Sequence, residues 1–192
     1  MVRLRRPVNK RFLSPDEFLG DCWALARLIE QGGWYPTHLV GLWRGGAPVA
    51  VAVQEWLAAR GIDTDHCAVR TRSYRGIGEQ ADEVRVDGLE YLVQTVAADS
   101  RLLLVDDIHD SGRSLAAVIE ALRKTCGERL PREIRRATLY YHPGHGAGTS
   151  PPDYHVHQTD CWVVFPHELV GLTAEEILQH KPAAAASGGI CE

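Results

Sequence analysis

The groups in this chain best suited to chemistry lie in nine consecutive residues, 106–114, with the sequence DDIHDSGRS. Three carboxylates fall within five of these residues and repel one another, so a cation, hydroxyl donors or solvent must offset their charge. Ser111, Gly112 and Ser114 follow where we expect a helix to begin, and the backbone N–H groups of such a turn bind phosphate. The segment therefore suits a sugar phosphate that also carries a metal-bound polyphosphate.

Two other motifs share part of this pattern and do not fit it. A Walker A loop requires GxxxxGK[ST], which the chain lacks. The order Asp106-Asp107-x-x-Asp110 also matches the DDxxD of prenyl-diphosphate enzymes, but that motif lies on a helix in larger, all-helical proteins, and here an apolar run, RLLLV, precedes it. A solvated acidic turn with a helix cap is the structural alternative. The buried strand, the paired acids and the D-S-G-R-S spacing together favour a phosphate site.

The run LLLVDDIHDSGRSL, residues 102–115, resembles the 5-phosphoribosyl-1-pyrophosphate (PRPP) motif of type I phosphoribosyltransferases. That motif is an apolar strand, two acids, two spacers and D-[TS]-G-x-[TS]. By this resemblance Asp106 and Asp107 lie under the ribose hydroxyls and face Mg²⁺, while Asp110 faces the incoming base as a catalytic residue. The resemblance assigns binding of the 5′-phosphate to Ser111, Gly112, Arg113 and Ser114.

A second segment, residues 42–46 (LWRGG), resembles the pyrophosphate loop of the same family. Gly45 and the glycine after it allow the backbone to approach an anion closely, and Arg44 can donate two hydrogen bonds to pyrophosphate. In the family this loop often carries a cis non-proline peptide bond, for which Trp43–Arg44 is the candidate here. An isolated RGG indicates only a tight turn, but its place before the first core helix favours the functional interpretation.

A polar, glycine-bearing stretch over 73–85 begins with Ser73 and Tyr74 and has no apolar periodicity, so we expect a long loop. In the family, a flexible loop that begins in this way closes over the bound substrates. Closure excludes water from the cationic ribosyl centre. A solvated hairpin tip is the structural alternative for this stretch.

The segment 160–166 (DCWVVFP) resembles the D-x-W-x-x-x-P strand of bacterial and archaeal 6-oxopurine phosphoribosyltransferases. By that resemblance Trp162 stacks on the purine, and Glu168 lies where the family can place a further Mg²⁺-facing carboxylate. Two positions depart from these relatives: His142 replaces a Lys that reads the purine O6, and His167 replaces a frequent Trp. A neutral His donates only one hydrogen bond, which makes His142 a weaker, pH-dependent reader of a carbonyl.

The resemblance implies a Mg²⁺-dependent purine phosphoribosyltransferase of purine salvage that uses PRPP and a 6-oxopurine, namely hypoxanthine, guanine or xanthine. Because of His142, adenine or a pyrimidine remains an alternative acceptor. A PRPP-sensing regulatory protein is the alternative from another class, but it would need an added DNA-binding domain or a basic face, and we expect neither here. Dimers and tetramers are usual in the family, so we expect a homodimer or homotetramer, with Trp23 or Trp56 at a subunit contact.

Alternating strands and helices must position these segments. Hydrophobic patterns predict strands over 38–43, 68–71, 101–105, 137–141 and 161–165, and helices from the Ser14 cap to Gly32, over 48–59, over 115–124 and after Thr173. This alternation predicts an α/β fold with a mostly parallel twisted sheet flanked by helices, and ligands of such sheets bind beyond the carboxyl ends of the strands.

The resemblance adds to this fold a small hood formed by the C-terminal segment. We expect a single domain over 1–181, with a core of about 36–142 and a hood of about 143–172 plus the N-terminal segment. Residues 182–192 (PAAAASGGICE) are expected to form a disordered tail.

Length and composition limit the class of protein. The 192 residues suffice for one α/β domain, and 45% hydrophobic with 24% charged residues is near the globular average, which excludes disordered chains. No stretch reaches about 18 uncharged apolar residues, so we expect no membrane span, and the basic start lacks the apolar segment of a secretory signal. Five cysteines without a CxxC pair predict reduced thiols in the cytoplasm, and a net charge of −4 argues against nucleic-acid partners.

Overall fold

The computed structural model describes residues 9–74, 83–144 and 150–186, without the side chains of residues 73, 74 and 83. The chain forms two compact units. The larger unit is Asp21–Asp160, and the smaller one combines the segment that ends at Gly20 with the segment that begins at Cys161.

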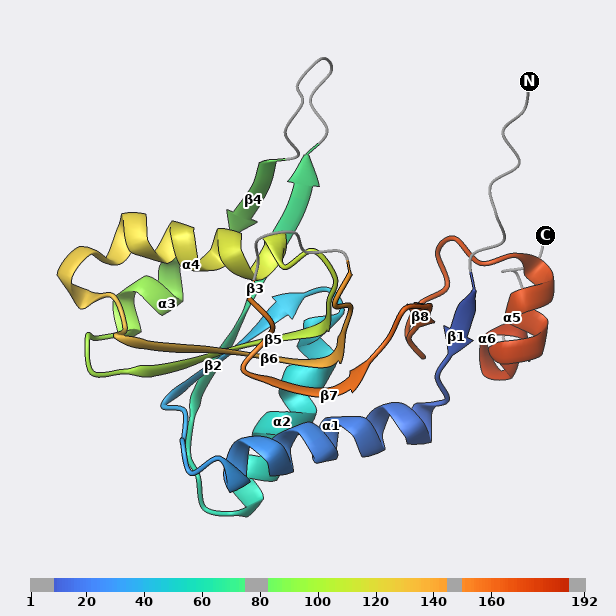
Figure 1. Cartoon of the computed structure of the whole chain (residues 1–192), viewed down its shortest axis with the longest axis horizontal. Coiled ribbons are helices and arrows are strands. Elements are labelled where there is room, and N and C mark those ends of the chain that lie inside the picture. The colour runs from blue at the N-terminus through green and yellow to red at the C-terminus, as the bar shows by residue number, and fades with distance from the viewer. Residues whose placement is uncertain (1–8, 75–82, 145–149, 187–192) are drawn as a thin grey trace. The chain divides into compact units, whose positions relative to one another are not determined.

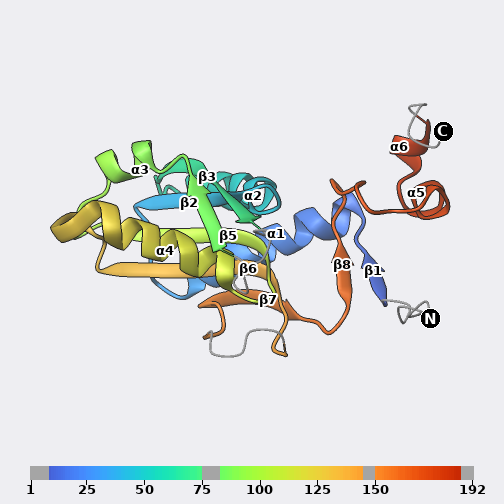
Figure 2. The same ribbon diagram turned by 90° about the horizontal axis from the view of Figure 1, so that it is seen from above.

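A six-stranded sheet with the order β4-β3-β2-β5-β6-β7 forms the centre of the larger unit (Figure 1). All neighbouring strands are parallel except β3 and β4, which are antiparallel. Figure 2 shows β2, β5 and β6 side by side, with β7 at one edge. The strands are β2 (His38–Trp43), β3 (Asp65–Tyr74), β4 (Glu83–Asp87), β5 (Arg101–His109), β6 (Glu133–Tyr141) and β7 (Tyr154–Gln158). This architecture confirms the predicted α/β fold.

Helices cover both faces of this sheet. In Figure 1, α2 and the part of α1 from Asp21 onward lie on one side, and α3 and α4 lie on the other. Asp21 ties α1 to the sheet, because it accepts a hydrogen bond from the Tyr140 hydroxyl at 3.3 Å and pairs with His157 Nε2 at 2.8 Å. The helical elements are α1 (Pro15–Gln31), α2 (Gly46–Ala59), α3 (Glu90–Thr95), α4 (Arg113–Cys126) and the 3₁₀ helix η1 (Gly127–Arg129).

The hydrophobic core follows from the apolar run of β5. Residues 102–105 are fully buried, as the continuous apolar sequence of this strand predicts. On the α3/α4 side, Leu102 and Leu104 pack with residues of α4 that recur at helical spacing, including Leu115, Val118 and Leu122. The packing fixes β5 in the middle of the sheet, so the acidic residues that follow its apolar part have a defined position.

Both helices predicted to begin at Ser14 and Thr173 start with a capping box. The Ser14 amide donates to Glu17 Oε2 at 2.9 Å, and the Glu17 amide donates to Ser14 Oγ at 3.2 Å. Thr173 and Glu176 make the same reciprocal pair at the start of α5 (Ala174–His180). Each box satisfies two backbone donors that the first turn of a helix leaves open, so both helix starts follow from local sequence.

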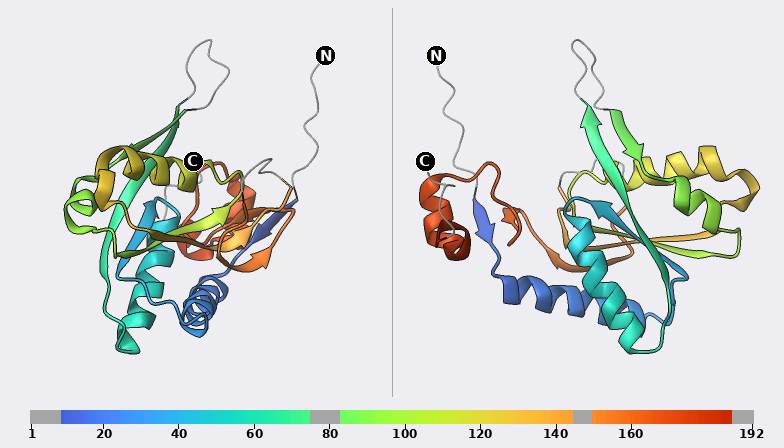
Figure 3. Two further views of the ribbon diagram at one scale, coloured as in Figure 1. Left: turned by 60° about the vertical axis from the view of Figure 1, so that its left-hand side comes forward. Right: turned by 180° about the vertical axis from the view of Figure 1, so that it is seen from behind.

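The smaller unit joins the two ends of the chain through a parallel pair of short strands, β1 (Lys10–Phe12) and β8 (Trp162–Val164). Beside this pair lie α5 and α6 (Pro182–Ala186) (Figure 3). The Phe12 ring stacks on His180 with centroids 3.9 Å apart, and Lys10 pairs with Glu176 at 2.6 Å. These contacts link β1 to α5 across most of the sequence.

Several elements differ from the sequence-based expectation. Residues 182–186 form α6 instead of a disordered tail, because Pro182 suits the first helical position and alanines favour helix. Residues up to Tyr74 belong to β3 and residues from Glu83 to β4, so every described residue of the loop predicted over 73–85 is extended strand. Residues 154–158 form β7, which pairs with β6 in the larger unit, although they fall in the range expected for the hood.

The cysteines and the helices of the described residues bear on two sequence-based predictions. Within these residues no helix combines the length and the apolar character needed to cross a membrane. The four cysteines in this part of the chain are free thiols, and burial raises the pKa of Cys22 to about 12. Trp23 is exposed on α1, whereas Trp56 is partly buried and donates to Glu30 Oε2 at 3.2 Å. The oligomeric state stays a prediction.

Substitution of one core leucine tests this packing. Leu104→Ala removes a fully buried side chain and should lower the free energy of unfolding by about 2–5 kcal/mol, because it leaves a cavity between β5 and α4. Leu178→Ala, at a leucine that is 61% exposed, is the matched control and should change it by less than about 0.5 kcal/mol. Denaturant titration measures both values, and equal effects of the two substitutions would contradict the assignment of Leu104 to the core.

Candidate functional site

The acidic pair of the site lies at the end of β5 and not in a loop after it. Asp106 and Asp107 are partly buried and are held by the backbone: the Asp107 amide donates to Asp106 Oδ1 at 3.0 Å, and the Ile108 amide donates to Asp107 Oδ1 at 2.8 Å. Burial, and next the neighbouring Asp107 carboxylate, raise the pKa of Asp106 well above its ordinary value. Its surroundings therefore disfavour the charged form of Asp106.

The glycines of residues 42–46 pack directly against this pair. A Cβ added to Gly45 would collide with the carboxylate of Asp107, and one added to Gly46 would lie 2.7 Å from the Cα of Asp106. This close approach requires glycine at both positions, because β2 and β5 are adjacent parallel strands that end at the same edge of the sheet. The two segments predicted from the sequence therefore form one site.

Helix α4 begins directly after the acidic residues, at the C-terminal end of the segment 106–114. Gly112 is the N-cap of α4 with a left-handed φ of 71°, and no side chain caps this helix. Its carbonyl accepts the first hydrogen bond of the helix from Ala116 at 3.0 Å. Arg113 Nε donates to Ser111 Oγ at 3.3 Å, and Ser114 lies in the first turn. The backbone N–H groups of such an uncapped first turn bind phosphate.

One histidine lies within the acidic segment, and a second lies next to it. His109 is only 2% exposed, and its ring packs edge-on against Tyr141 with centroids 5.5 Å apart. The His109 carbonyl accepts a hydrogen bond from the His142 amide at 2.9 Å, which places the start of the segment after β6 next to the end of β5. Burial lowers the pKa of His109, and within the described residues its Nδ1 has no hydrogen-bond partner. Asp110, the next residue along the chain, is exposed.

A cationic pocket of about 250 Å³ lies where β2 ends. The peptide bond Trp43–Arg44 is cis, as the sequence resemblance predicts. Trp43 lies opposite Arg70 in the parallel pair of β2 and β3, so Arg44 and the β3 arginines come together. The residues that line the pocket are Trp43, Arg44, Arg70, Thr71 and Arg72.

The arginines of this pocket differ in their partners. Arg72 pairs with Asp87 at 3.1 Å, and Arg85 pairs with the same carboxylate at 2.9 Å. Burial acts to raise the pKa of Asp87, but the hydrogen bonds and charges of Arg85 and Arg72 outweigh it, and the pKa is lowered. Within the described residues, Arg44 and Arg70 have no ion-pair partner. The pocket therefore carries uncompensated positive charge beside the acidic pair.

Sequence reasoning missed Arg70 and Arg72 as residues of the site. The available signal was their alternation along β3, which places both side chains on one face of the strand. The proximity of β3 to residues 42–46 depends on strand order, which the sequence pattern does not specify.

Other predicted site residues lie elsewhere or outside the described part. The backbone of Ser73 and Tyr74 ends β3, whereas their side chains and residues 75–82, most of the predicted lid, lie outside the described residues. Trp162 and Glu168 belong to the smaller unit, where both line a pocket of about 360 Å³. The structure therefore brings Trp162 and Glu168 together in one pocket of the smaller unit.

At the carboxyl edge of the parallel sheet, the structure thus brings together an acidic pair, an uncapped helix start and a cationic pocket, groups whose chemistry suits phosphates and hydroxyls. The sequence model of the family "Phosphoribosyl transferase domain" matches residues 19–175. The chain belongs to this family, which confirms the resemblance seen in the sequence.

Solved structures with the same fold include purine phosphoribosyltransferases. The enzyme from Pyrococcus horikoshii is 27% identical, with a TM-score of 0.64 over 85% of this chain and 97% of that one. A Neisseria gonorrhoeae protein with bound ppGpp is 21% identical, with a TM-score of 0.73 over 96% and 100%. The xanthine-guanine-hypoxanthine phosphoribosyltransferase of Helicobacter pylori is 19% identical, with a TM-score of 0.65 over 93% and 99%. No curated protein matches the chain.

Gly45→Ala tests the contact between the two segments. The added methyl group must displace the Asp107 carboxylate, and because misplaced binding groups are costly we expect PRPP binding to weaken roughly 10²-fold. Isothermal titration calorimetry measures the affinity. Gly20→Ala is the matched control, since nothing lies within 4 Å of the added atom. Unchanged affinity in Gly45→Ala would show that the contact has no part in binding.

Proposed function

We propose that this chain is a Mg²⁺-dependent purine phosphoribosyltransferase that transfers the 5-phosphoribosyl group of PRPP to a 6-oxopurine. The observation that carries the proposal is the packing of Gly45 and Gly46 against Asp106 and Asp107. It brings the acidic pair next to the cationic pocket, and these two groups would suit the ribose hydroxyls and the pyrophosphate of PRPP. The 27% identical purine phosphoribosyltransferase supports the choice of a purine.

The phosphate of the ribose would bind at the start of α4. The left-handed Gly112 and the uncapped first turn offer backbone N–H donors, and Ser111 and Ser114 offer hydroxyls. Arg113 adds a positive charge at the same place. Together these groups match a terminal phosphate, which prefers several converging donors and a helix N-terminus.

Asp106 and Asp107 suit both ribose hydroxyls and Mg²⁺. Among the residues the structure describes, no group of three or more His, Cys, Asp or Glu side chains is arranged around a metal position. Mg²⁺ in phosphate-handling sites is commonly held by one or two carboxylates together with substrate oxygens. Burial, and next the Asp107 carboxylate, raise the pKa of Asp106, and a bound cation would favour its charged form. When bound, the ion would offset the charge of the pyrophosphate group.

Transfer breaks the bond between C1′ and the pyrophosphate oxygen and forms a bond between C1′ and a purine nitrogen. The leaving pyrophosphate takes both electrons of the broken bond, and Arg44 and Arg70 are available to stabilise its charge. The purine loses one proton as it bonds to C1′, and the exposed carboxylate of Asp110 would accept that proton from N7. In the larger unit, His142 would contact the base.

The cationic pocket also favours a second candidate function. Trp43 is 54% exposed beside three arginines, an arrangement that can stack a base and bind polyphosphate. The N. gonorrhoeae protein of the same fold has ppGpp bound. A regulatory protein that binds PRPP or a guanosine polyphosphate without turnover would use the same pocket. Tight binding of such a ligand, together with the absence of transfer to any base, would select this candidate.

A panel of bases tests the proposed reaction. We expect pyrophosphate release from PRPP and Mg²⁺ with at least one of hypoxanthine, guanine and xanthine, and less with adenine, uracil and orotate. A coupled pyrophosphate assay measures the rates, and removal of Mg²⁺ by a chelator should abolish them. Release with adenine or a pyrimidine alone would replace the 6-oxopurine by that acceptor, and no release with any base would reject the enzyme.

Asp110→Asn tests the proton acceptor. The substitution keeps the shape of the side chain and removes its basicity, so we expect kcat to fall about 10²–10⁴-fold with little change in PRPP affinity. Asp99→Asn, at an exposed aspartate before β5, is the control and should leave kcat unchanged. Full turnover in the Asp110 variant would assign the proton to another group.

A further inference from the structure

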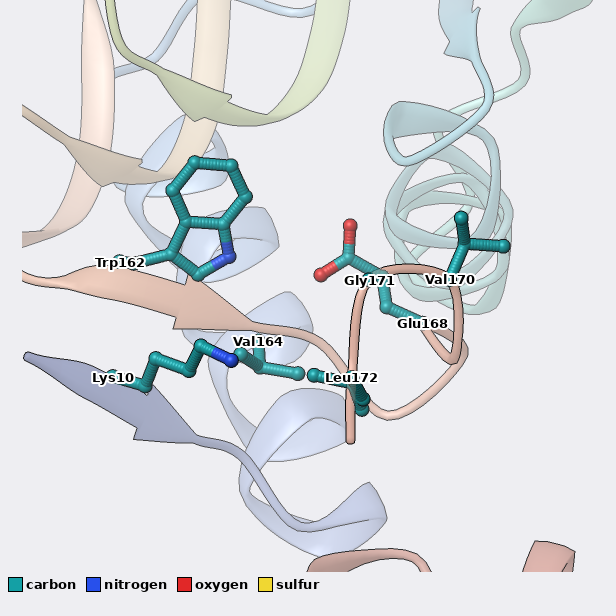
Figure 4. Close-up of a pocket in the computed structure, with 7 residues that line it drawn as sticks. All are labelled: Lys10, Trp162, Val164, Glu168, Val170, Gly171 and Leu172. Carbon is teal, nitrogen blue, oxygen red and sulfur yellow. The ribbon is translucent and has the colours of Figure 1, made fainter. Parts of the chain in front are cut away.

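The pocket of the smaller unit combines a flat aromatic wall, apolar contacts and one carboxylate (Figure 4). Trp162 is 62% exposed and presents its indole to the pocket, and Val164 and Leu172 provide apolar surface. Figure 4 shows the carboxylate of Glu168 directed toward the side on which Trp162 lies. The volume of about 360 Å³ is within the range of about 300–1,000 Å³ that small-molecule pockets usually have.

Glu168 is held in place by a tight turn. Its Oε2 accepts a hydrogen bond from the Phe165 amide at 3.0 Å, and its own amide donates to the Phe165 carbonyl at 3.0 Å. The buried Lys181 donates to the same carbonyl at 2.6 Å. Glu168 Oε1, by contrast, has no hydrogen-bond partner among the described residues. One carboxylate oxygen is therefore fixed by the protein while the other remains available to a ligand.

The other charged groups near this pocket already have partners. Lys10 lines the pocket, but its ammonium pairs with Glu176 at 2.6 Å. Lys181 interacts with the charge of Glu168, yet its ammonium donates to a backbone carbonyl and it does not line the pocket. The pocket thus presents a hydrogen-bond acceptor to a ligand and offers no comparable donor from a charged side chain.

We propose that Glu168 is a specificity-determining residue that selects a 2-amino-6-oxopurine, a base of the guanine type, over the 2-oxo base xanthine. This inference rests on the proposed function and names the substrate class of that reaction. Trp162 would stack on the flat ring, and the free carboxylate oxygen would accept hydrogen bonds from the edge of the base.

The chemistry of the three 6-oxopurines explains the selection. Guanine presents two adjacent donors, N1–H and the 2-amino group, to a carboxylate. Hypoxanthine presents only N1–H. Xanthine places a carbonyl oxygen at C2, which a carboxylate repels, and it loses a proton near neutral pH, which adds a second repulsion. A site that hydrogen-bonds a donor of its substrate rejects an analogue that lacks the donor more strongly than an apolar pocket rejects a change in size. We therefore expect the order guanine, hypoxanthine, xanthine.

Glu168→Gln tests this assignment. The glutamine carbonyl can still accept from the Phe165 amide, so its NH₂ group replaces the free oxygen and turns an acceptor into a donor. We expect kcat/KM for guanine to fall roughly 10- to 100-fold, the effect of losing hydrogen bonds to a charged group. The value for xanthine should stay constant or rise, because the amide can donate to its C2 carbonyl. Glu175→Gln, at an exposed neighbour on α5, is the control and should change neither.

Binding of the nucleotide products gives a readout independent of turnover. Quenching of tryptophan fluorescence should show that the wild-type protein binds GMP more tightly than XMP and that Glu168→Gln reduces this difference, while thermal unfolding shows that the variant is folded. Equal affinity of the wild-type protein for GMP and XMP would overturn the inference even if the variant does not fold. If no base is turned over, the proposed function is rejected. The GMP and XMP affinities would still test the role of Glu168 in that case.

Two results of the kcat/KM measurements on Glu168→Gln would also overturn the proposed role of Glu168. An equal loss of kcat/KM for all three bases would assign Glu168 a structural role. A higher Mg²⁺ requirement with an unchanged order of bases would make Glu168 the metal-facing carboxylate that the sequence resemblance implies.

Discussion

The close packing of Gly45 and Gly46 against Asp106 and Asp107 is the constraint on which the site depends. It exists because β2 and β5 are neighbours in a parallel sheet, so that the segments leaving them emerge side by side. Any side chain at these glycines would separate the two segments. The buried apolar residues of β5 resist such a separation, because they fix the strand between helices on both faces. The fold thereby holds like-charged carboxylates close to one another.

The acidic and the cationic groups of the site come from different strands of the larger unit. The carboxylates extend from β5, whereas the arginines of the pocket come from β3 and from the end of β2. Asp87 of β4 pairs with Arg72 and Arg85, so Arg44 and Arg70 keep their charge available for a ligand. A polyanion with hydroxyl groups matches this division, because its phosphates and its hydroxyls need partners of opposite kinds. Net charge of the whole chain, −4, gives no indication of such a local arrangement.

Local signals made much of the fold and part of the site predictable. Residues 101–105 are a continuous apolar run, and Ser14 and Thr173 begin capping boxes, so β5, α1 and α5 follow from neighbouring residues alone. The cis bond after Trp43 follows from resemblance. The position of Arg70 in the cationic pocket depends on the order of the strands. The contact between the ends of β5 and β6 depends on the hydrogen bond from the His142 amide to the His109 carbonyl. Such long-range pairings leave no periodic trace in a single sequence.

The pairing of β1 with β8 has a consequence for the synthesis of the protein. Asn9 and Cys161, which are hydrogen-bonded next to this pair, are 152 positions apart in the sequence. A chain grows from its N-terminus, so β1 emerges from the ribosome long before the strand that completes it. Closing so large a loop is entropically costly, and the larger unit, which is contiguous in sequence, can form first and shorten the distance. During translation, β1 is an unpaired strand that must be kept from pairing with other chains.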